Sequence, residues 1–452
     1  MTFQATFSAA AVAVLLGGCA STQPLATSVT PPSLGSGFPR YESTDPPSSI
    51  DEPQGEISLK EALSLALLHN PKLAAFSWEI RAREAESLQA GLRPNPELAA
   101  ELENFGGTGV VSGFQANETT LALSQLIELG GKRSRRLEVA NLDRDLAAWD
   151  YEGTRIDVLT ETTKAFVAVL AAQEQLSQAD ELIDVADSVL QSVARRVRAG
   201  ATSPVEESRA RVSLETSRID REGRARELSV ARTQLAAHWG GIQPRFTAGR
   251  GDLDQLQAVP DLISLSADIQ QTPAVARWTT ELTRRLAERE LSRSIGMPDL
   301  DLGAGFRHFT ETGDVGIVLG VSLPLPLFDR NQGALNAAEM RIAQAEHARR
   351  SVETAVHTAL QASHADAAAS FDEAAALRDR AIPEAESAFA LAEEAYRRGL
   401  MRLTDVLDTQ RALFELKGRL IDALLRYHAA IAELERFTGA PISNLPRDQR
   451  RP

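Results

Sequence analysis

The chain contains an internal repeat, in which one structural unit occurs twice at an interval of about 200 residues. The sequence "NPKLAAFSWE" at 70–79 corresponds to "TPAVARWTTE" at 272–281, and Gly200 corresponds to Gly399. Each half has the same predicted order: a helix, two strands, a very long helix, a glycine turn and a second long helix. This repeat is the strongest indication of how the chain is organised.

The predicted domains follow from this repeat and from changes in composition. Residues 20–56 are rich in Pro and Ser and have little apolar periodicity, which predicts an extended tether without its own core. The predicted domains are a signal peptide at 1–18, a lipid-anchored linker at 19–56, a first repeat at 57–240, an inter-repeat linker at 241–260, a second repeat at 261–440 and a C-terminal tail at 441–452.

Composition excludes several classes of protein. Of the 452 residues, 43% are hydrophobic and only 5% aromatic, which favours helices over a β-sandwich. The formal net charge is -14 and there is no basic cluster, so nucleic acid is not an expected partner. The sequence has no nucleophile-base pair, phosphate loop or cofactor motif, so we expect neither an enzyme nor a bound cofactor.

The single cysteine, Cys19, follows a short apolar run at 7–16 and small residues. This pattern is typical of a secretory signal and is too short for a membrane-spanning helix. "LLGGC" resembles a bacterial lipobox, which implies cleavage before Cys19 and lipid on its sulfur. Ala20 and Ser21, in place of Asp, indicate the outer membrane. The alternative is a buried cysteine that follows a degenerate signal.

Four segments alternate apolar with small or polar residues, which predicts strands with one apolar face. The predicted strands lie at 97–106, 118–129, 299–310 and 315–326. Strands of about ten residues with an apolar face match the height of a transmembrane barrel. Four strands cannot close a barrel, and lipid does not tolerate an open edge, so three copies are expected to supply twelve strands. Two soluble hairpins packed on helices remain the alternative.

Two segments, 132–198 and 332–398, contain almost no glycine and are rich in Ala, Glu, Arg and Leu. A continuous helix of this size reaches about 100 Å, which is longer than an ordinary globular domain. Pro383 is expected to bend or interrupt the second of these helices. His347, His357 and His364 lie on it, but no pair has the i, i+4 spacing that places two imidazoles on one metal ion, so we expect no metal site.

Each long helix is followed by a glycine and a return helix, which predicts two antiparallel helical hairpins. The first return helix opens with "SPVE" at 203–206, a predicted capping box in which Ser203 caps the helix and Glu206 reaches back. The second contains a heptad row typical of coiled-coil packing. That row is Val406, Leu413, Leu420, Tyr427 and Leu434, with Leu403, Leu424 and Ile431 on the companion seam.

These features resemble the TolC-type outer membrane factors over residues 57–440. The specific markers are the duplicated element order, "LPLPLFDRNQG" at 323–333 and "YRRGLMRLTDVLDTQ" at 396–410. Together with the lipobox, the first motif is most similar to the heavy-metal branch represented by CusC and CzcC. The resemblance implies a mainly α fold with a small β part: a trimeric 12-stranded transmembrane β-barrel continuous with a 12-helix periplasmic α-barrel.

The resemblance also implies a periplasmic gate. Asp405 and Asp408 match aspartates that line the closed entrance, and Tyr396 matches a tyrosine that helps to hold it. Met401 stands where some relatives have an arginine, with Arg402 next to it, so the partner of the aspartates is left open. The repeat aligns Asp405 with Glu206, and a first-turn acid is also favoured by the helix dipole. The expected adaptor-docking residues are Gly200, Ala201, Thr202, Ser203, Gly399, Leu400 and Met401.

The expected function is the exit duct of a tripartite efflux system of the RND type, which exports heavy-metal cations or small toxic compounds. The expected partners are two further copies of the chain, a periplasmic adaptor, an inner-membrane pump and outer membrane lipids. The expected location is the outer membrane, with a lipid anchor and a periplasmic extension. The alternatives are a lipid-anchored coiled-coil spacer without a pore and the exit duct of a type I protein secretion system.

Overall fold

The computed structural model describes residues 52–267 and 269–439. The predicted lipidation residue Cys19, the signal peptide and the tail lie outside the described residues. The described part is mostly helical with few strands, as predicted. In chain order its strands and helices are β1 Gly55–Ser58, α2 Leu59–His69, α3 Pro71–Ala90, β2 Glu97–Glu103, β3 Glu118–Ile127, α4 Lys132–Arg198, α5 Pro204–Ala237, β4 Phe246–Arg250, α6 Leu262–Ser266, α7 Pro273–Ile295, β5 Leu300–Phe309, β6 Val315–Ser322, α8 Gln332–Ala376, α9 Ile382–Arg397 and α10 Leu403–Thr438.

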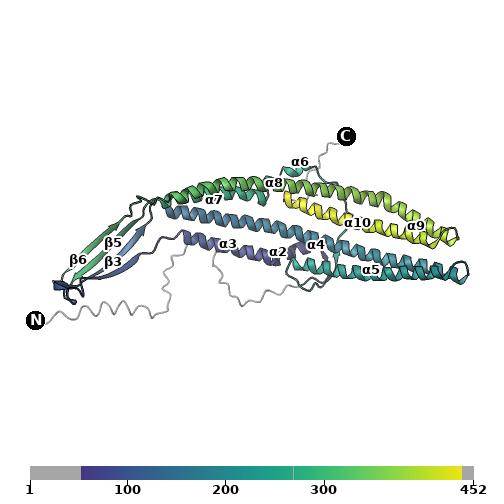
Figure 1. The fold of residues 1–452 in the computed structure, drawn as a ribbon, viewed down its shortest axis with the longest axis horizontal. Helices are drawn as coiled ribbons and strands as arrows, with labels where there is room; N and C mark the ends of the chain where they lie inside the picture. The colour runs from purple at the N-terminus through teal and green to yellow at the C-terminus, as the bar shows by residue number, and fades with distance from the viewer. Residues whose placement is uncertain (1–51, 268, 440–452) are drawn as a thin grey trace. The chain divides into compact units, whose positions relative to one another are not determined.

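The four longer strands form one antiparallel sheet in the order β2-β3-β5-β6. The pairing of β3 with β5 joins the two repeats, with Leu121 opposite Phe306. Within the described residues, β2 and β6 each pair with one strand only, so the sheet has two open edges. Figure 1 shows this sheet at one end of the helical part, the end at which α4 and α8 begin.

The register gathers apolar side chains on one face of the sheet, because paired residues of an antiparallel ladder point to the same side. That face carries Leu98, Ala100, Leu102, Leu121, Leu123, Leu302, Ala304, Phe306, Val315, Ile317, Leu319 and Val321. The opposite face is mainly polar or small. Ile317, Leu319 and Val321 are 76%, 78% and 73% exposed, so the hairpins do not pack on helices as the soluble alternative required.

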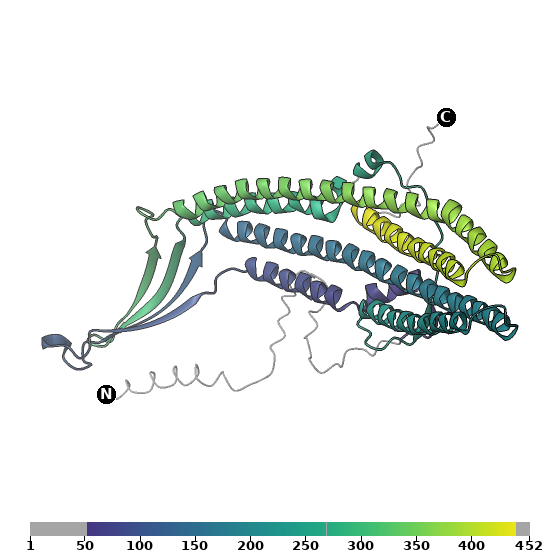
Figure 2. The ribbon, with the colours of Figure 1, turned by 45° about the vertical axis from the view of Figure 1, so that its right-hand side comes forward.

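The long helix α4 has the predicted bounds and packs against α3, α5, α7 and α10. Figure 2 shows α4 with α5, and α8 and α9 with α10, as two hairpins whose tips lie away from the sheet. The largest buried cluster joins Phe166 of α4, Leu235 of α5 and Leu424 of α10. The heptad prediction for α10 is confirmed, since Val406, Leu413, Tyr427 and Leu434 are buried and Leu420 is half-buried against the same core. None of the helices in the described ranges combines the length and apolar character needed to cross a membrane.

The second long helix is interrupted near Pro383, as predicted. A π-helical turn at Leu377–Ala381 separates α8 from α9, and Pro383 lies in the first turn of α9. Proline has no N–H and its ring crowds the preceding turn, so the α-helical bonding pattern cannot continue unchanged. The N–H of Ile382 instead donates to the carbonyl of Leu377, a bond that spans five residues.

A second, two-stranded sheet was not predicted from the sequence. The strands β1 and β4 pair in parallel, and β4 lies inside the expected inter-repeat linker. The chain that follows β4 is then fastened to the long helices. The hydroxyl of Tyr427 accepts the N–H of Gln257 at 3.0 Å and donates to its carbonyl at 2.7 Å. His364 Nε2 lies 3.0 Å from the carbonyl of Pro260, so this histidine holds the linker.

Candidate functional site

Both helical hairpins turn through the same glycine-centred motif. Gly200 and Gly399 have φ angles of 70° and 77°, a left-handed conformation that glycine adopts without steric cost. The N–H of Ala201 donates to the carbonyl of Arg196 at 2.9 Å, and the N–H of Leu400 closes the second tip in the same way at 2.9 Å. This is the Schellman motif, which satisfies the last carbonyls of a helix. The two repeats therefore end in tips of the same construction.

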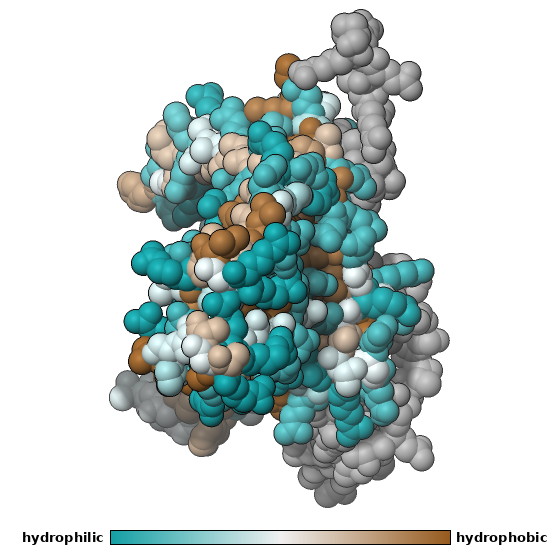
Figure 3. Space-filling model, turned by 90° about the vertical axis from the view of Figure 1, so that its right-hand side faces the viewer, coloured by the Kyte–Doolittle hydropathy of each residue, from teal (hydrophilic) through white to brown (hydrophobic). Residues whose placement is uncertain are grey.

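Most of the residues expected to dock an adaptor are exposed at these tips. The exposed residues are Gly200, Ala201, Ser203, Gly399, Leu400 and Met401. Leu400 is 79% exposed, so its side chain is available to a partner at the second tip. Thr202 is half-buried, and its hydroxyl donates to Glu206. Figure 3 views this end of the molecule and shows mainly hydrophilic side chains with smaller hydrophobic areas between them.

Of the two contacts in the capping box predicted at 203–206, the one made by Ser203 is confirmed and the one made by Glu206 is wrong. Ser203 does cap α5, because its hydroxyl accepts the N–H of Val205 at 3.3 Å, with Pro204 at the first helical position. Glu206 does not return to the backbone of Ser203. Its carboxylate is turned toward the other hairpin, where Tyr396 offers a buried hydroxyl that competes with the local backbone N–H.

Tyr396 joins the two hairpins. Its hydroxyl donates to the carboxylate of Glu206 at 3.0 Å, and only 3% of the residue is exposed. Burial and the hydrogen bond to Glu206 raise the pKa of Tyr396 to about 12, since both disfavour the phenolate. The hydroxyl therefore remains protonated and able to donate across the physiological pH range.

Arg196 makes the second connection between the hairpins. Its guanidinium donates to the carbonyls of Tyr396 and Arg397, the latter at 3.2 Å, near the C-terminal end of α9. The same guanidinium lies 4.8 Å from the centroid of the Tyr396 ring, a cation-π contact. A cation at the end of a helix is favoured by the helix dipole. Arg196 and Glu206 thus hold Tyr396 from two sides.

Asp405 and Asp408 pair with arginines on their own helix. Arg402 Nη2 lies 3.3 Å from Asp405 Oδ1, and Arg411 Nη1 lies 3.1 Å from Asp408 Oδ1. The side chains of Arg402 and Arg411 are 82% and 74% exposed, so each pair contributes at most about 1 kcal/mol. Arg402 is therefore the partner of Asp405 within one chain, and both carboxylates remain accessible from solvent.

The core below the tips contains a buried amide. Val193, Ala210 and Leu403 belong to a buried cluster that also includes Tyr396. Gln410, on the apolar seam of α10, is only 3% exposed, and its Nε2 has no hydrogen-bond partner among the described residues. A polar residue in a coiled-coil seam specifies register at a cost in stability. Within the described ranges, no three His, Cys, Asp or Glu side chains are grouped closely enough to hold a metal ion.

Sequence reasoning missed Arg196 and misread Glu206. Glu206 has the spacing of a capping acid, so its contact with a residue 190 positions away was hidden by a plausible local role. Arg196 is one of three arginines in the last turn of α4, where helix-dipole stabilisation is a sufficient explanation for each. The available signal was the repeat, which places the tips at equivalent positions in the two hairpins.

Comparison with known proteins agrees with this architecture. Residues 62–241 and 265–440 match the outer membrane efflux protein family. The cobalt-zinc-cadmium resistance protein CzcC of Cupriavidus metallidurans is 34% identical over 86% of this chain and 91% of its own length. The nickel and cobalt resistance protein CnrC of the same organism is 28% identical over 68% of this chain and 71% of its own length.

Solved structures show the same fold. A crystal structure of CusC superposes with a TM-score of 0.72 over 86% of this chain and 95% of that chain, at 19% sequence identity. The resemblance predicted from the duplicated element order and the two motifs is confirmed by these comparisons. The chain belongs to the outer membrane efflux protein family.

Proposed function

We propose that this protein is the outer membrane exit duct of a tripartite efflux system. The observation that carries the proposal is the four-stranded sheet with an exposed apolar face and two open edges, β2 and β6. Exposed apolar strands are costly in water and favourable in lipid, whereas open edges are not tolerated in lipid. Both requirements are met when neighbouring copies pair edge to edge.

Three copies of the chain are enough to close the sheet into a barrel. Because all four strands are antiparallel, β6 of one copy runs antiparallel to β2 of the next, and three copies of four strands make a twelve-stranded barrel. The polar face of each sheet then lines the lumen, and the apolar face contacts lipid. The solved structure of CusC is described as forming a transmembrane channel, which supports a closed assembly of this kind.

The hairpin tips form the periplasmic gate in this proposal. The contacts of Tyr396 with Glu206 and Arg196 hold the two hairpins together. Asp405 and Asp408 from three chains gather carboxylates around the entrance, and a ring of acids favours cations at a pore mouth. The exposed tips at Gly200 and Gly399 receive the periplasmic adaptor.

Metal cations are the proposed cargo. CzcC and CnrC are named for resistance to cobalt, zinc and cadmium and to nickel and cobalt, and this chain spans most of the length of both. The proposed pump is of the RND type, and the proposed anchor is lipid on Cys19. Outer membrane efflux channels are not enzymes, which confirms the prediction that the chain has no catalytic role.

Conductance of the purified full-length protein in planar bilayers tests the duct and its gate. We expect cation-selective conductance that loses selectivity in the double variant Asp405→Asn, Asp408→Asn. The matched control is the double variant Asp180→Asn, Asp379→Asn, which removes two exposed carboxylates, each also paired with an arginine, away from the tips. Equal selectivity in all three proteins would remove the aspartates from the gate, and absence of any conductance would favour the spacer without a pore.

The assembly and the anchor need separate measurements. A cross-linking ladder of the full-length protein should end at three copies, and a ladder that ends at two would exclude closure by three. Labelled palmitate should be incorporated by the wild type and lost in Cys19→Ser. Survival of a deletion strain on zinc, cobalt, cadmium and antibiotics identifies the cargo, and protein secretion by the intact strain distinguishes the type I alternative.

A further inference from the structure

A compact zone lies where the chain passes between the sheet and the helices. We call it the crossing zone and define it as residues 91–96, 128–133, 295–299 and 323–331. Hydrogen bonds hold its segments to one another or to an adjoining helix. The N–H of Leu129 donates to Asp299 Oδ1 at 3.0 Å, and Asn331 Nδ2 donates to the carbonyl of Ser292 at 2.7 Å. Two of its segments are therefore joined directly, and a third is fixed to α7.

The apolar face of the sheet continues into this zone. The alternation of β6 extends past its last paired residue, Ser322, through Leu323, Leu325 and Leu327. Leu325 and Leu327 are 71% and 68% exposed, and the adjacent Phe328 is 89% exposed. Pro324 and Pro326 have no N–H to donate, so this stretch cannot extend the β-ladder. Its apolar side chains are thus available to a partner other than a strand.

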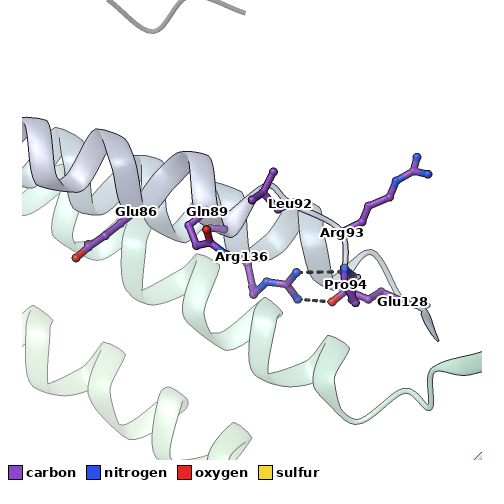
Figure 4. A pocket seen from close by; sticks show the side chains of 8 residues that line it. Glu86, Gln89, Leu92, Arg93, Pro94, Glu128 and Arg136 are labelled. Carbon is purple, nitrogen blue, oxygen red and sulfur yellow. Dashed lines mark hydrogen bonds and ion pairs between the residues drawn. The ribbon is translucent and has the colours of Figure 1, made fainter. Parts of the chain in front are cut away.

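Exposed arginines accompany these apolar residues. Arg93, Arg133 and Arg330 lie at three of the four crossings, and none forms an ion pair with a described residue. Two of the carboxylates nearby are occupied, because Glu128 pairs with Arg136 and Asp299 with Lys132. The third, Asp329, is exposed and accepts the N–H of Asn331 at 2.8 Å. Figure 4 shows Arg93 extended away from the ribbon while Arg136 turns to Glu128. The zone therefore presents three exposed arginines against one exposed carboxylate that has no ion pair among the described residues.

Apolar side chains next to unpaired arginines match the boundary of a lipid bilayer. The strands are 7 to 10 residues long, close to the height of a transmembrane strand, so the crossing zone falls at the end of the hydrocarbon region. Leucine and phenylalanine side chains enter the acyl chains there, while arginine side chains reach toward the headgroups. The guanidinium geometry allows bidentate hydrogen bonding to a phosphate.

We infer that the crossing zone binds anionic phospholipid headgroups at the periplasmic surface of the outer membrane, through Arg93, Arg133 and Arg330. The inference rests on the proposed membrane-spanning role of the sheet. The arginines hold phosphate groups while Leu325, Leu327 and Phe328 occupy the acyl region. The site fixes the depth at which the sheet sits in the bilayer.

Lipid binding by the full-length protein tests the inference. The variant carries Arg93→Gln, Arg133→Gln and Arg330→Gln. The matched control has the same change of charge at three exposed arginines on α5 and α8, namely Arg209→Gln, Arg226→Gln and Arg350→Gln. Native mass spectrometry in detergent measures binding of phosphatidylglycerol and, separately, of zwitterionic phosphatidylcholine. One arginine near an anionic surface contributes about fivefold in affinity, so we expect at least a tenfold loss in the variant and no loss in the control.

Failure of the lipid-binding inference can be distinguished from failure of the proposed function. Equal phosphatidylglycerol affinity in the variant and wild type, or an equal loss in the control, would overturn the inference. Displacement of the lipid by millimolar inorganic phosphate alone would also overturn it, since the bound group would then be a free phosphate. If the variant still conducts ions in planar bilayers, a failed lipid measurement leaves the duct intact. If even the wild type neither inserts nor conducts, the proposed function fails first.

Discussion

Removing the hydroxyl of Tyr396 should weaken the contact between the two hairpins with little change in shape. In Tyr396→Phe the ring still fills its buried site, but Glu206 loses a donor at 3.0 Å. A hydrogen bond to a charged group contributes about 1.5–3 kcal/mol. Glu206 keeps the hydroxyl of Thr202, so we expect the lower end of this range. A change of ~1.5 kcal/mol shifts the equilibrium between joined and separated tips about tenfold toward separation in each chain.

The assay is the open probability of single channels in planar bilayers, compared with Tyr427→Phe. Tyr427 is equally buried, and its hydroxyl bonds the backbone of Gln257 in the linker, away from the tips. We expect a higher open probability only in Tyr396→Phe. Equal behaviour of the two variants would refute the assignment of Tyr396 to the gate.

The elevated pKa of Tyr396 adds a second test of the same contact. The hydroxyl has a pKa of about 12 in the folded protein against an ordinary value of 10.0, because burial and Glu206 disfavour the phenolate. The stabilisation is therefore complete below pH 10 and is lost as the pH rises through 12. Open probability in the wild type should not change between pH 7 and 9 through ionisation of this residue, and a change there that Tyr396→Phe abolishes would contradict the assignment.

Three further substitutions probe the fold. Gln410→Leu should raise the free energy of unfolding by about 1–2 kcal/mol, measured by denaturant titration in detergent, because it removes a buried Nε2 that has no described partner. Burial lowers the pKa of His238, so unfolding should become easier as the pH falls below 6.5, and His238→Gln should reduce this pH dependence in thermal melts followed by circular dichroism. Gly305→Val should prevent insertion into bilayers, since a Cβ at residue 305 would lie 2.4 Å from the carbonyl oxygen of Leu121 on the paired strand; normal conductance would contradict this.

Local patterns in the sequence determined the elements of the fold. The bounds of α4, the interruption at Pro383 and the buried seam of α10 all follow from residues within a few turns of one another. Helix periodicity, proline chemistry and strand alternation act over short distances, so they can be read without the tertiary structure. The same applies to the apolar face of the sheet, which each strand already carries in its own alternation.

Only the tertiary structure decided which distant groups meet. Glu206 has two possible partners, the N–H of its own first turn and a tyrosine hydroxyl on another helix, and the sequence favours the near one. Packing places the hydroxyl of Tyr396 at 3.0 Å from the carboxylate of Glu206, so Glu206 binds the distant partner instead. The parallel pairing of β1 with β4 is likewise invisible locally, because their partners lie about 190 residues apart. Short-range chemistry thus specified the helices and strands, while the contacts that join them depend on the fold that brings them together.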